Sequence, residues 1–266
     1  MNRVRRAGSG GSGRFRRRLR LVAPLALGIL VAGCAVSVDG TARPGANVTP
    51  RLLTGSTIQG VLLGDSALSR ILNQSFMIDS RYPPRFGGPE TLQDDGAGLP
   101  GGCLGVAWML QQDVYQPGEV RHVAVETWRN AATPVEVTSV KEAVVSLPTA
   151  ADARALFAKF SEQWRTCDGT TSPLPGSMFR LNAKTTNVQA ADSVVAATVS
   201  TGFASLSSDA AAIPAGRAIG VRGNCLVEVE VDFFSTSSPS RQRAGDVNTA
   251  AVEIAHAMMD SVSALS

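Results

Sequence analysis

The chain has 266 residues, a formal net charge of +3, 44% hydrophobic residues and 5% aromatic residues, which is an ordinary composition for a globular protein. Eight of its 25 basic residues lie in residues 1–33, which contain no acidic residue, so residues 34–266 combine 17 basic with 22 acidic side chains and carry a net charge of −5. This charge excludes a basic domain that binds nucleic acid through clustered Lys and Arg, and we expect no nucleic-acid partner.

Residues 1–33 are typical of a secretory signal peptide. An arginine-rich block precedes an apolar run at 21–33, which has 13 residues and is too short for a membrane-spanning helix of about 20. The segment Val31-Ala-Gly-Cys34 resembles a bacterial lipobox. This resemblance implies attachment of lipid (palmitate) to Cys34 and anchoring to the outer face of the cell membrane. An ordinary cleaved signal with a chance cysteine is the alternative, and the pattern leaves Sec and twin-arginine export open.

Residues 34–50 are small, polar and interrupted by proline, which indicates a flexible tether. We therefore expect a signal peptide at 1–33, the tether at 34–50 and one folded domain at 51–266.

The first half of that domain predicts one short helix and two strands. Asp65–Asn73 has the spacing of a helix, with Asp65 or Ser66 as N-cap, and the Gly- and Pro-rich residues 82–102 predict a long loop. Residues 121–129 alternate as in a strand, and residues 135–147 predict a further strand. One face of the first strand carries His122, Ala124, Glu126 and Trp128, and the other face carries Val123, Val125 and Thr127.

The second half adds a long helix, several strands and a C-terminal helix. Thr149 and Asp152 form a capping-box variant ahead of an apolar helix face, which comprises Ala153, Leu156, Phe157, Phe160 and Trp164. Strands follow around 178–181 and 193–201, and residues 219–221 and 225–234 predict a hairpin. Asp246 is expected to cap the last helix. This order of elements predicts an α+β domain in which helices pack on a twisted antiparallel sheet.

Three cysteines lie in the predicted domain. Their spacings match no CxxC metal or redox motif, and thiols outside the cytoplasm tend to pair. Cys103 and Cys167 both lie at the ends of predicted elements, so we expect a disulfide between them. Cys225 begins a core-facing strand row and is expected to stay free.

Several of these residues resemble the PknH-like extracellular sensor domain family of mycobacteria, which also occurs in mycobacterial lipoproteins. They are Cys103-Leu-Gly-Val-Ala-Trp108, Tyr115, Trp164-Arg-Thr-Cys167 and the hairpin Gly216–Asn224. The resemblance implies a twisted antiparallel sheet with helices around a cleft, and a role in extracytoplasmic sensing or ligand binding. The family usually has a second disulfide at the late hairpin, where this chain has Ala215 and Asp232.

The motifs for catalysis and metal binding are weak. Gly64-Asp-Ser66-Ala resembles the GDSL hydrolase signature, with Glu253 and His256 as the remaining candidates, but alanine replaces the final leucine and a helix cap explains Asp-Ser equally well. His122 and His256 are the only histidines and do not form a metal-binding pattern, so we expect no metal and no cofactor. The acidic row on the 225–234 strand is either a cation site or, as we expect, a solvent-exposed face; it comprises Glu228, Glu230 and Asp232.

These observations favour a lipid-anchored extracytoplasmic lipoprotein that is sensor-like, binds a ligand and is not an enzyme. Its partners would be the membrane, through Cys34, and an unidentified small molecule, lipid or envelope component. Trp108, Tyr115, Trp128 and the loop at 82–102 are candidates to line the cleft, and core packing is the alternative for Trp128 and Trp164. A carrier of envelope lipids or glycolipids is the second hypothesis, and a GDSL-like serine hydrolase that uses Ser66 is the third.

Overall fold

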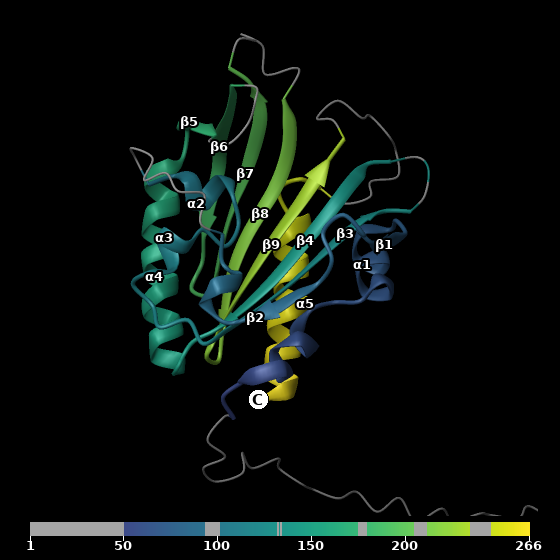
Figure 1. Ribbon diagram of the computed structural model, residues 1–266. Coiled ribbons are helices and arrows are strands. Elements are labelled where there is room, and N and C mark those ends of the chain that lie inside the picture. Colours follow the sequence, from purple (N-terminus) through teal and green to yellow (C-terminus); the bar gives the residue numbers. More distant parts are fainter. Residues whose placement is uncertain are drawn as a thin grey trace, which may run out of the picture. The chain divides into compact units, whose positions relative to one another are not determined.

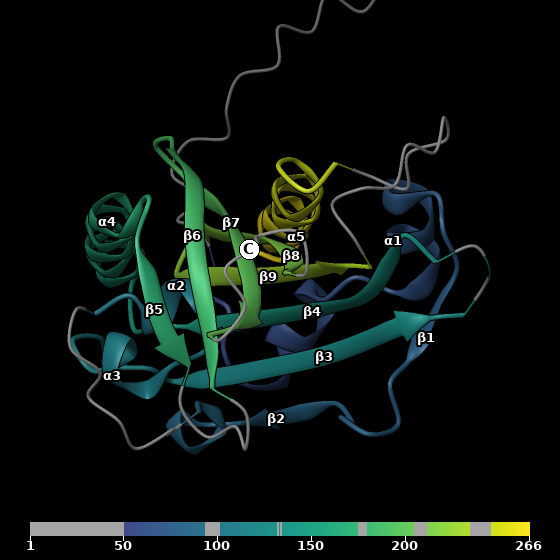
Figure 2. The same ribbon diagram turned by 90° about the horizontal axis from the view of Figure 1, so that it is seen from above.

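An open nine-stranded antiparallel sheet forms the centre of the domain in a computed structural model (Figures 1 and 2). The structure describes residues 51–93, 102–131, 133, 135–174, 180–204, 212–234 and 246–266, so the predicted signal peptide, Cys34 and the tether lie outside the described residues. Across the sheet the strands follow the order β1-β3-β4-β9-β8-β7-β6-β5, and β2 also pairs with β3. With helices packed on this sheet, the predicted α+β class is confirmed.

The elements have the following bounds. The strands are β1 (Phe76–Ile78), β2 (Arg85–Gly87), β3 (His122–Asn130), β4 (Val137–Ser146), β5 (Thr171–Leu174), β6 (Leu181–Ala190), β7 (Val194–Phe203), β8 (Ile213–Arg222) and β9 (Cys225–Phe233). The helices are η1 (Gly55–Val61), α1 (Asp65–Leu72), η2 (Pro89–Thr91), α2 (Leu104–Ala107), α3 (Gln112–Tyr115), α4 (Ala150–Cys167) and α5 (Ala250–Leu265), where η marks a 3₁₀ helix.

The sheet has a hydrophobic core on each face, because apolar side chains point alternately to its two sides. In β3, Ala124 and Trp128 pack on one face and Val123 and Val125 on the other, as predicted. The helices η1, α1 and α5 cover the first face, which we call the α5 face, and α2, α3 and α4 cover the second, which we call the α4 face. Figure 2 shows α4 and α5 on opposite sides of β6 and β7.

Helix α4 forms as its sequence predicts. The Thr149 hydroxyl accepts a hydrogen bond from the Asp152 backbone N–H at 3.1 Å and donates one to the Asp152 carboxylate at 2.7 Å, which satisfies an otherwise unpaired N–H of the first turn. The predicted apolar residues of this helix are all buried, from Ala153 to Trp164.

Helix α5 lies close to β8 because two glycines leave room for it. A Cβ at Gly216 would lie 2.5 Å from the Val247 carbonyl oxygen, and one at Gly220 would lie 2.8 Å from the Met259 sulfur. The predicted cap of this helix is wrong by one turn. Asp246 accepts a hydrogen bond from the Asn248 N–H in the turn that precedes the helix, and the helix begins at Ala250.

Two other predictions near the start of the domain need correction. The N-cap of α1 is Gly64 and forms no side-chain cap, because the helix begins one residue earlier than expected, with Asp65 in its first turn. The predicted loop at 82–102 contains the edge strand β2 and the 3₁₀ helix η2, and its residues 94–101 lie outside the described residues. Three-residue elements are too short to show a hydrophobic period, so the sequence pattern did not indicate them.

The expected disulfide joins Cys103, just before α2, to Cys167 at the end of α4, with a Cα–Cα distance of 5.7 Å. Cys225 is free and fully buried, and burial raises the pKa of its thiol to about 12.

The described chain starts and ends at the same end of the sheet, beside the turn between β8 and β9 (Figure 1). The buried Asn224 side chain in that turn accepts a hydrogen bond from the Leu53 N–H and donates to the carbonyls of Leu53 and Leu147. Within the described residues, no helix has the length and hydropathy needed to cross a membrane.

Candidate functional site

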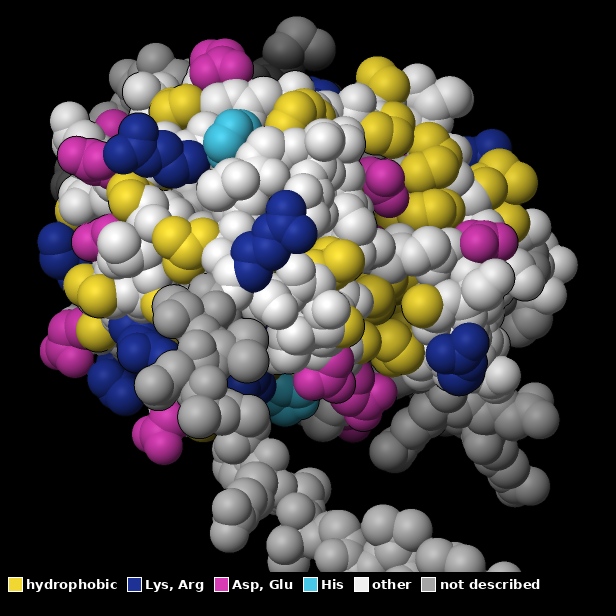
Figure 3. Space-filling view, turned by 90° about the horizontal axis from the view of Figure 1, so that it is seen from below, with side chains coloured by type: hydrophobic (Ala, Val, Ile, Leu, Met, Phe, Trp, Pro, Cys, Tyr) yellow, Lys and Arg dark blue, Asp and Glu magenta, His cyan; other side chains and the backbone are white. Residues whose placement is uncertain are grey.

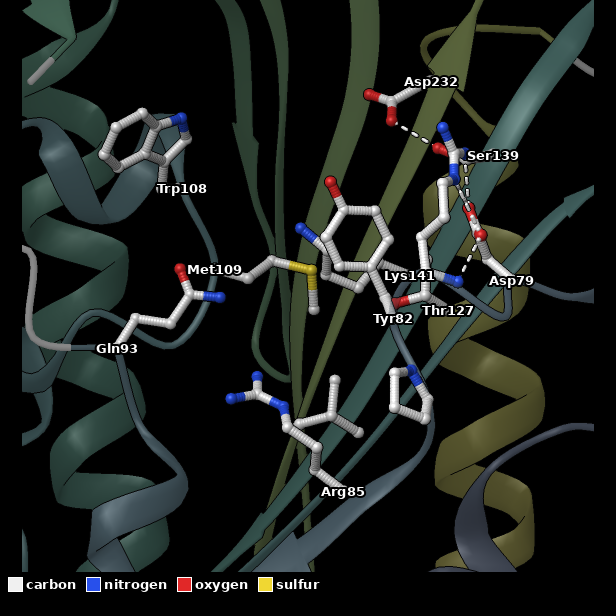
Figure 4. Close-up of a pocket in the computed structure, with 13 residues that line it drawn as sticks. Asp79, Tyr82, Arg85, Gln93, Trp108, Met109, Thr127, Ser139, Lys141 and Asp232 are labelled. Carbon is white, nitrogen blue, oxygen red and sulfur yellow. Dashed lines mark hydrogen bonds and ion pairs between the residues drawn. The ribbon is translucent and has the colours of Figure 1, made fainter. Parts of the chain in front are cut away.

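A cavity of about 760 Å³ lies over the α4 face of the sheet. Its walls are the connection from β1 to β2, strand β2 and the segment after α2, and its floor comprises β3, β4 and β9 (Figure 4). This volume is in the range of sites that bind small molecules. The cavity also has the position that ligand sites often take, with loops beside a rigid sheet.

Strand register brings the floor residues together. Thr127 of β3 lies directly opposite Lys141 of β4, and Ser139 of β4 lies opposite Asp232 of β9. Because side chains alternate along a strand, these polar residues all point to the α4 face beside the buried Val125.

A row of charged side chains, increasingly buried, continues from the cavity floor into the α4-face core. Lys141 pairs with Glu230 at 3.2 Å, and the fully buried Arg217 pairs with Glu228 at 3.2 Å and lies 3.8 Å from Glu230. The Tyr115 hydroxyl donates to Glu228. The predicted exposed acidic row is therefore wrong: Glu228 is buried against Arg217 of β8, Glu230 is paired with Lys141 of β4, and Asp232 is partly buried on the cavity floor.

Arg217 also ties this row of charged side chains to α2. Its guanidinium donates to the carbonyls of Val106 at 3.0 Å and Gly105 at 3.3 Å, and it lies 5.7 Å from the ring centroid of Trp164. Hydrogen-bond acceptors thus surround the buried Arg217 guanidinium on several sides, and they compensate for the loss of its hydration.

Burial and neighbouring charge shift the pKa values on the floor. Burial, reinforced by the charge of Glu230, raises the pKa of Asp232 to about 6, although the Ser139 hydroxyl donates to it at 2.5 Å. The charge of Glu230 raises the pKa of Lys141. For Glu230 itself, burial acts to raise the pKa, but the cations Lys141 and Arg217 outweigh it and lower the value.

The walls carry two arginines in different situations. Arg81 binds the carboxylate of the buried Asp79 at 2.6 Å, and its hydrogen bonds lower the pKa of Asp79 to about 2. Arg85, on β2, lines the cavity, and its guanidinium forms no ion pair or hydrogen bond with any residue that the structure describes. Tyr82, which is 61% exposed, also lines the cavity, and its ring lies 5.8 Å from the Arg81 guanidinium carbon.

Of the three aromatic residues predicted to line the cleft, the structure puts only Trp108 at the cavity. Tyr115 is 1% exposed and its ring is edge-on to Phe160 in the core, so the prediction that it lines the cleft is wrong. Trp128 lies on the α5 face at 7% exposure and is also a core residue, as is Trp164. The loop at 82–102, also predicted to line the cleft, does so through Tyr82, Arg85 and Gln93. The sequence pattern did not indicate Asp79, Arg81 and Lys141 as cavity residues, because register between distant segments brings them together.

The structure does not support the hydrolase geometry. Residues 55–61 before Ser66 form a 3₁₀ helix, where the GDSL pattern requires a strand. The exposed Ser66 hydroxyl contacts Asp65 at 3.4 Å, and no hydrogen bond among the described residues joins it to the exposed His256.

A second buried carboxyl lies on the α5 face, away from the cavity. Glu142 is fully buried and accepts hydrogen bonds from the Trp128 indole at 3.2 Å and the Leu63 N–H at 3.4 Å. Burial raises its pKa to about 8; the charge of Glu126, which lies opposite on β3, acts in the same direction, and the two donors act against it.

Comparisons with known proteins identify relatives of this fold. A family model described as the PknH-like extracellular domain matches residues 53–261. The crystal structure of the extracellular domain of PknH from Mycobacterium tuberculosis is similar, with a TM-score of 0.63 and 19% sequence identity, and the match covers 80% of this chain and 98% of that chain. No curated protein matches the chain. At this identity the structural likeness establishes a shared fold.

Proposed function

The chain belongs to the PknH-like extracellular domain family, and on this premise we propose that it is a lipid-anchored, extracytoplasmic, sensor-like protein that binds a ligand without catalysing a reaction. The observation that carries the proposal is the cavity of about 760 Å³ over the α4 face, bounded by charged and aromatic side chains. The ligand binds there, and a second protein receives the signal.

The lining of the cavity favours a sensor over the second hypothesis, a carrier of envelope lipids. A carrier needs a large apolar space for acyl chains, whereas the floor of this cavity has Thr127, Ser139, Lys141 and Asp232. Burying acyl chains against the ionisable groups Lys141 and Asp232 would remove their remaining contact with water at a cost in free energy.

Lipid at Cys34 is the proposed attachment to the membrane. The predicted lipobox supports this. On the end of the domain where the described chain starts and ends, the described basic and acidic side chains are mixed (Figure 3). Replacing Cys34 by Ser should release the protein from the membrane fraction, and mass spectrometry should find acyl chains on the wild-type N-terminal peptide. Retention of the variant in the membrane would contradict the anchor.

Native mass spectrometry tests ligand binding. The full protein, purified in mild detergent from its own cell envelope, should carry a bound molecule of defined mass. Thr127→Trp, which fills the floor of the cavity, should lose that molecule, whereas Thr171→Trp at an exposed strand position outside the cavity should keep it. A bound molecule that survives Thr127→Trp in the folded protein would refute the cavity as the site.

A further inference from the structure

One side of the cavity carries three hydrogen-bond donors that are free to meet a ligand. In Figure 4, the Arg85 guanidinium and the Gln93 amide nitrogen point into the space beside Met109, and the nitrogen edge of Trp108 faces the cavity. The Gln93 amide oxygen accepts a hydrogen bond from Gln111, which leaves the amide nitrogen for a ligand. The carboxylates of Asp79 and Asp232 lie on the opposite side.

The other charges of the cavity already have partners. Asp79 binds Arg81, and Lys141 binds Glu230. Asp232 accepts a hydrogen bond from Ser139. Since Arg85 has no such partner among the described residues, its charge is the one that an incoming group can neutralise without breaking an existing pair.

Strand register holds Arg85 in place. Arg85 of β2 lies opposite Val125 of β3, and Phe86 lies opposite Ala124. Alternation therefore turns Arg85 toward the cavity and Phe86 toward the α5 face, where its ring stacks on His122 with centroids 6.1 Å apart. The guanidinium is thus directed into the cavity by a paired strand.

We propose that the cavity binds a small organic anion, a phosphate monoester or a carboxylate, with its charged group at Arg85 and Gln93 and its organic part against Trp108 and Tyr82. This inference rests on the proposed ligand-binding function and names the chemical class of the ligand. A planar guanidinium matches phosphate and carboxylate oxygens with two parallel hydrogen bonds. The aromatic side chains offer apolar faces to a ring.

Calorimetric titration of the full protein in non-ionic detergent tests the proposal with probes that differ in charge. Phenyl phosphate should bind, and benzyl alcohol and benzylamine, which have the same ring with no charge or a positive charge, should bind at least about tenfold more weakly. Arg85→Gln should weaken phenyl phosphate binding at least about tenfold. Arg85→Lys keeps the positive charge but cannot form two parallel hydrogen bonds, and it should weaken phenyl phosphate binding less than Arg85→Gln does. Arg70→Gln, at an exposed position on α1, should leave phenyl phosphate binding unchanged.

Glycerol phosphate separates the two sources of such an anion. Tighter binding of phenyl phosphate assigns a ring-bearing soluble compound, and tighter binding of glycerol phosphate assigns a lipid headgroup; both results support an anion site. Equal binding of benzyl alcohol and phenyl phosphate, or unchanged affinity in folded Arg85→Gln and Arg85→Lys, overturns it. Absence of binding by both phosphates and by benzoate, the corresponding aromatic carboxylate, up to 10 mM also overturns it. If the anion site is overturned, a molecule retained in native mass spectrometry would still support ligand binding. Failure of the anion site can therefore be distinguished from failure of the proposed function.

Discussion

Replacement of Glu142 by Gln removes a buried ionisable group and keeps its size. In the folded protein this carboxyl lies under Leu63 and beside the Trp128 indole, fully shielded from solvent. The amide can accept only one of the two hydrogen bonds, and we expect this to cost a constant free energy at every pH. The ionisation of Glu142 adds a second contribution to stability, which depends on pH and disappears in the variant.

The size of that contribution follows from its pKa, which burial raises from 4.5 to about 8. The unfolded chain loses this proton near pH 4.5, whereas the folded protein keeps it until about pH 8. The unfolded state is therefore favoured progressively as the pH rises between these values, and stability falls. Integration from pH 5 to pH 8 gives a loss of about 3.5 kcal/mol, a large part of the ~5–15 kcal/mol that stabilises a typical domain.

Urea unfolding at pH 5, 6, 7 and 8, followed by tryptophan fluorescence, measures the effect. The difference in unfolding free energy between wild type and Glu142→Gln should shift by about 3.5 kcal/mol in favour of the variant between pH 5 and pH 8. Asp232 titrates in the same window in both proteins and cancels. The matched control is Glu119→Gln, at a side chain that is 77% exposed, and it should show no such shift. If the difference in unfolding free energy between wild type and Glu142→Gln is the same at all four pH values, the conclusion that Glu142 is buried and protonated in the folded protein is refuted.

Three further variants test the covalent and steric features of the fold. Cys167→Ser opens a 64-residue loop and should lower the unfolding free energy by about 4 kcal/mol in urea, and a reductant should then have no additional effect; unchanged stability would contradict the disulfide. Ala215 and Asp232 lie directly opposite on β8 and β9, so Ala215→Cys with Asp232→Cys should form a second disulfide worth about 3 kcal/mol, and free thiols after mild oxidation would contradict that register. Gly216→Ala should lower thermal stability by about 1–3 kcal/mol because its Cβ would meet a backbone carbonyl of the segment before α5, whereas Gly64→Ala, with open space around its Cβ, should not; equal effects would contradict the close approach of α5.

Local patterns predicted much of the secondary structure. The capping box at Thr149 and the helix face from Ala153 to Trp164 are confirmed, because capping and amphipathicity depend on residues within a few positions of one another. The core-facing row that begins at Cys225 is confirmed for the same reason. The pairing of Cys103 with Cys167 could also be predicted, since both lie at element ends.

The cavity could not be predicted from such patterns. Alternation along β9 correctly put Glu228, Glu230 and Asp232 on one face, but it cannot tell a solvated face from one that is buried against cations from other strands. One signal was available: Arg217 is an isolated charge among small and apolar residues, which is unusual unless a carboxylate is buried opposite it. Arg85 is in a strand of three residues, too short for any period to reveal.

The clamp at Asn224 has a consequence for where the cavity lies along the sheet. Ser139, on the cavity floor, is eight residues of extended chain from Leu147, which directly follows β4 and together with Leu53 binds the Asn224 amide. Eight residues of extended chain span about 26 Å, so Ser139 lies far from the end of the sheet at which the described chain enters the domain. Substitutions at the hairpin turn should therefore leave the affinity for a ligand at this part of the cavity unchanged.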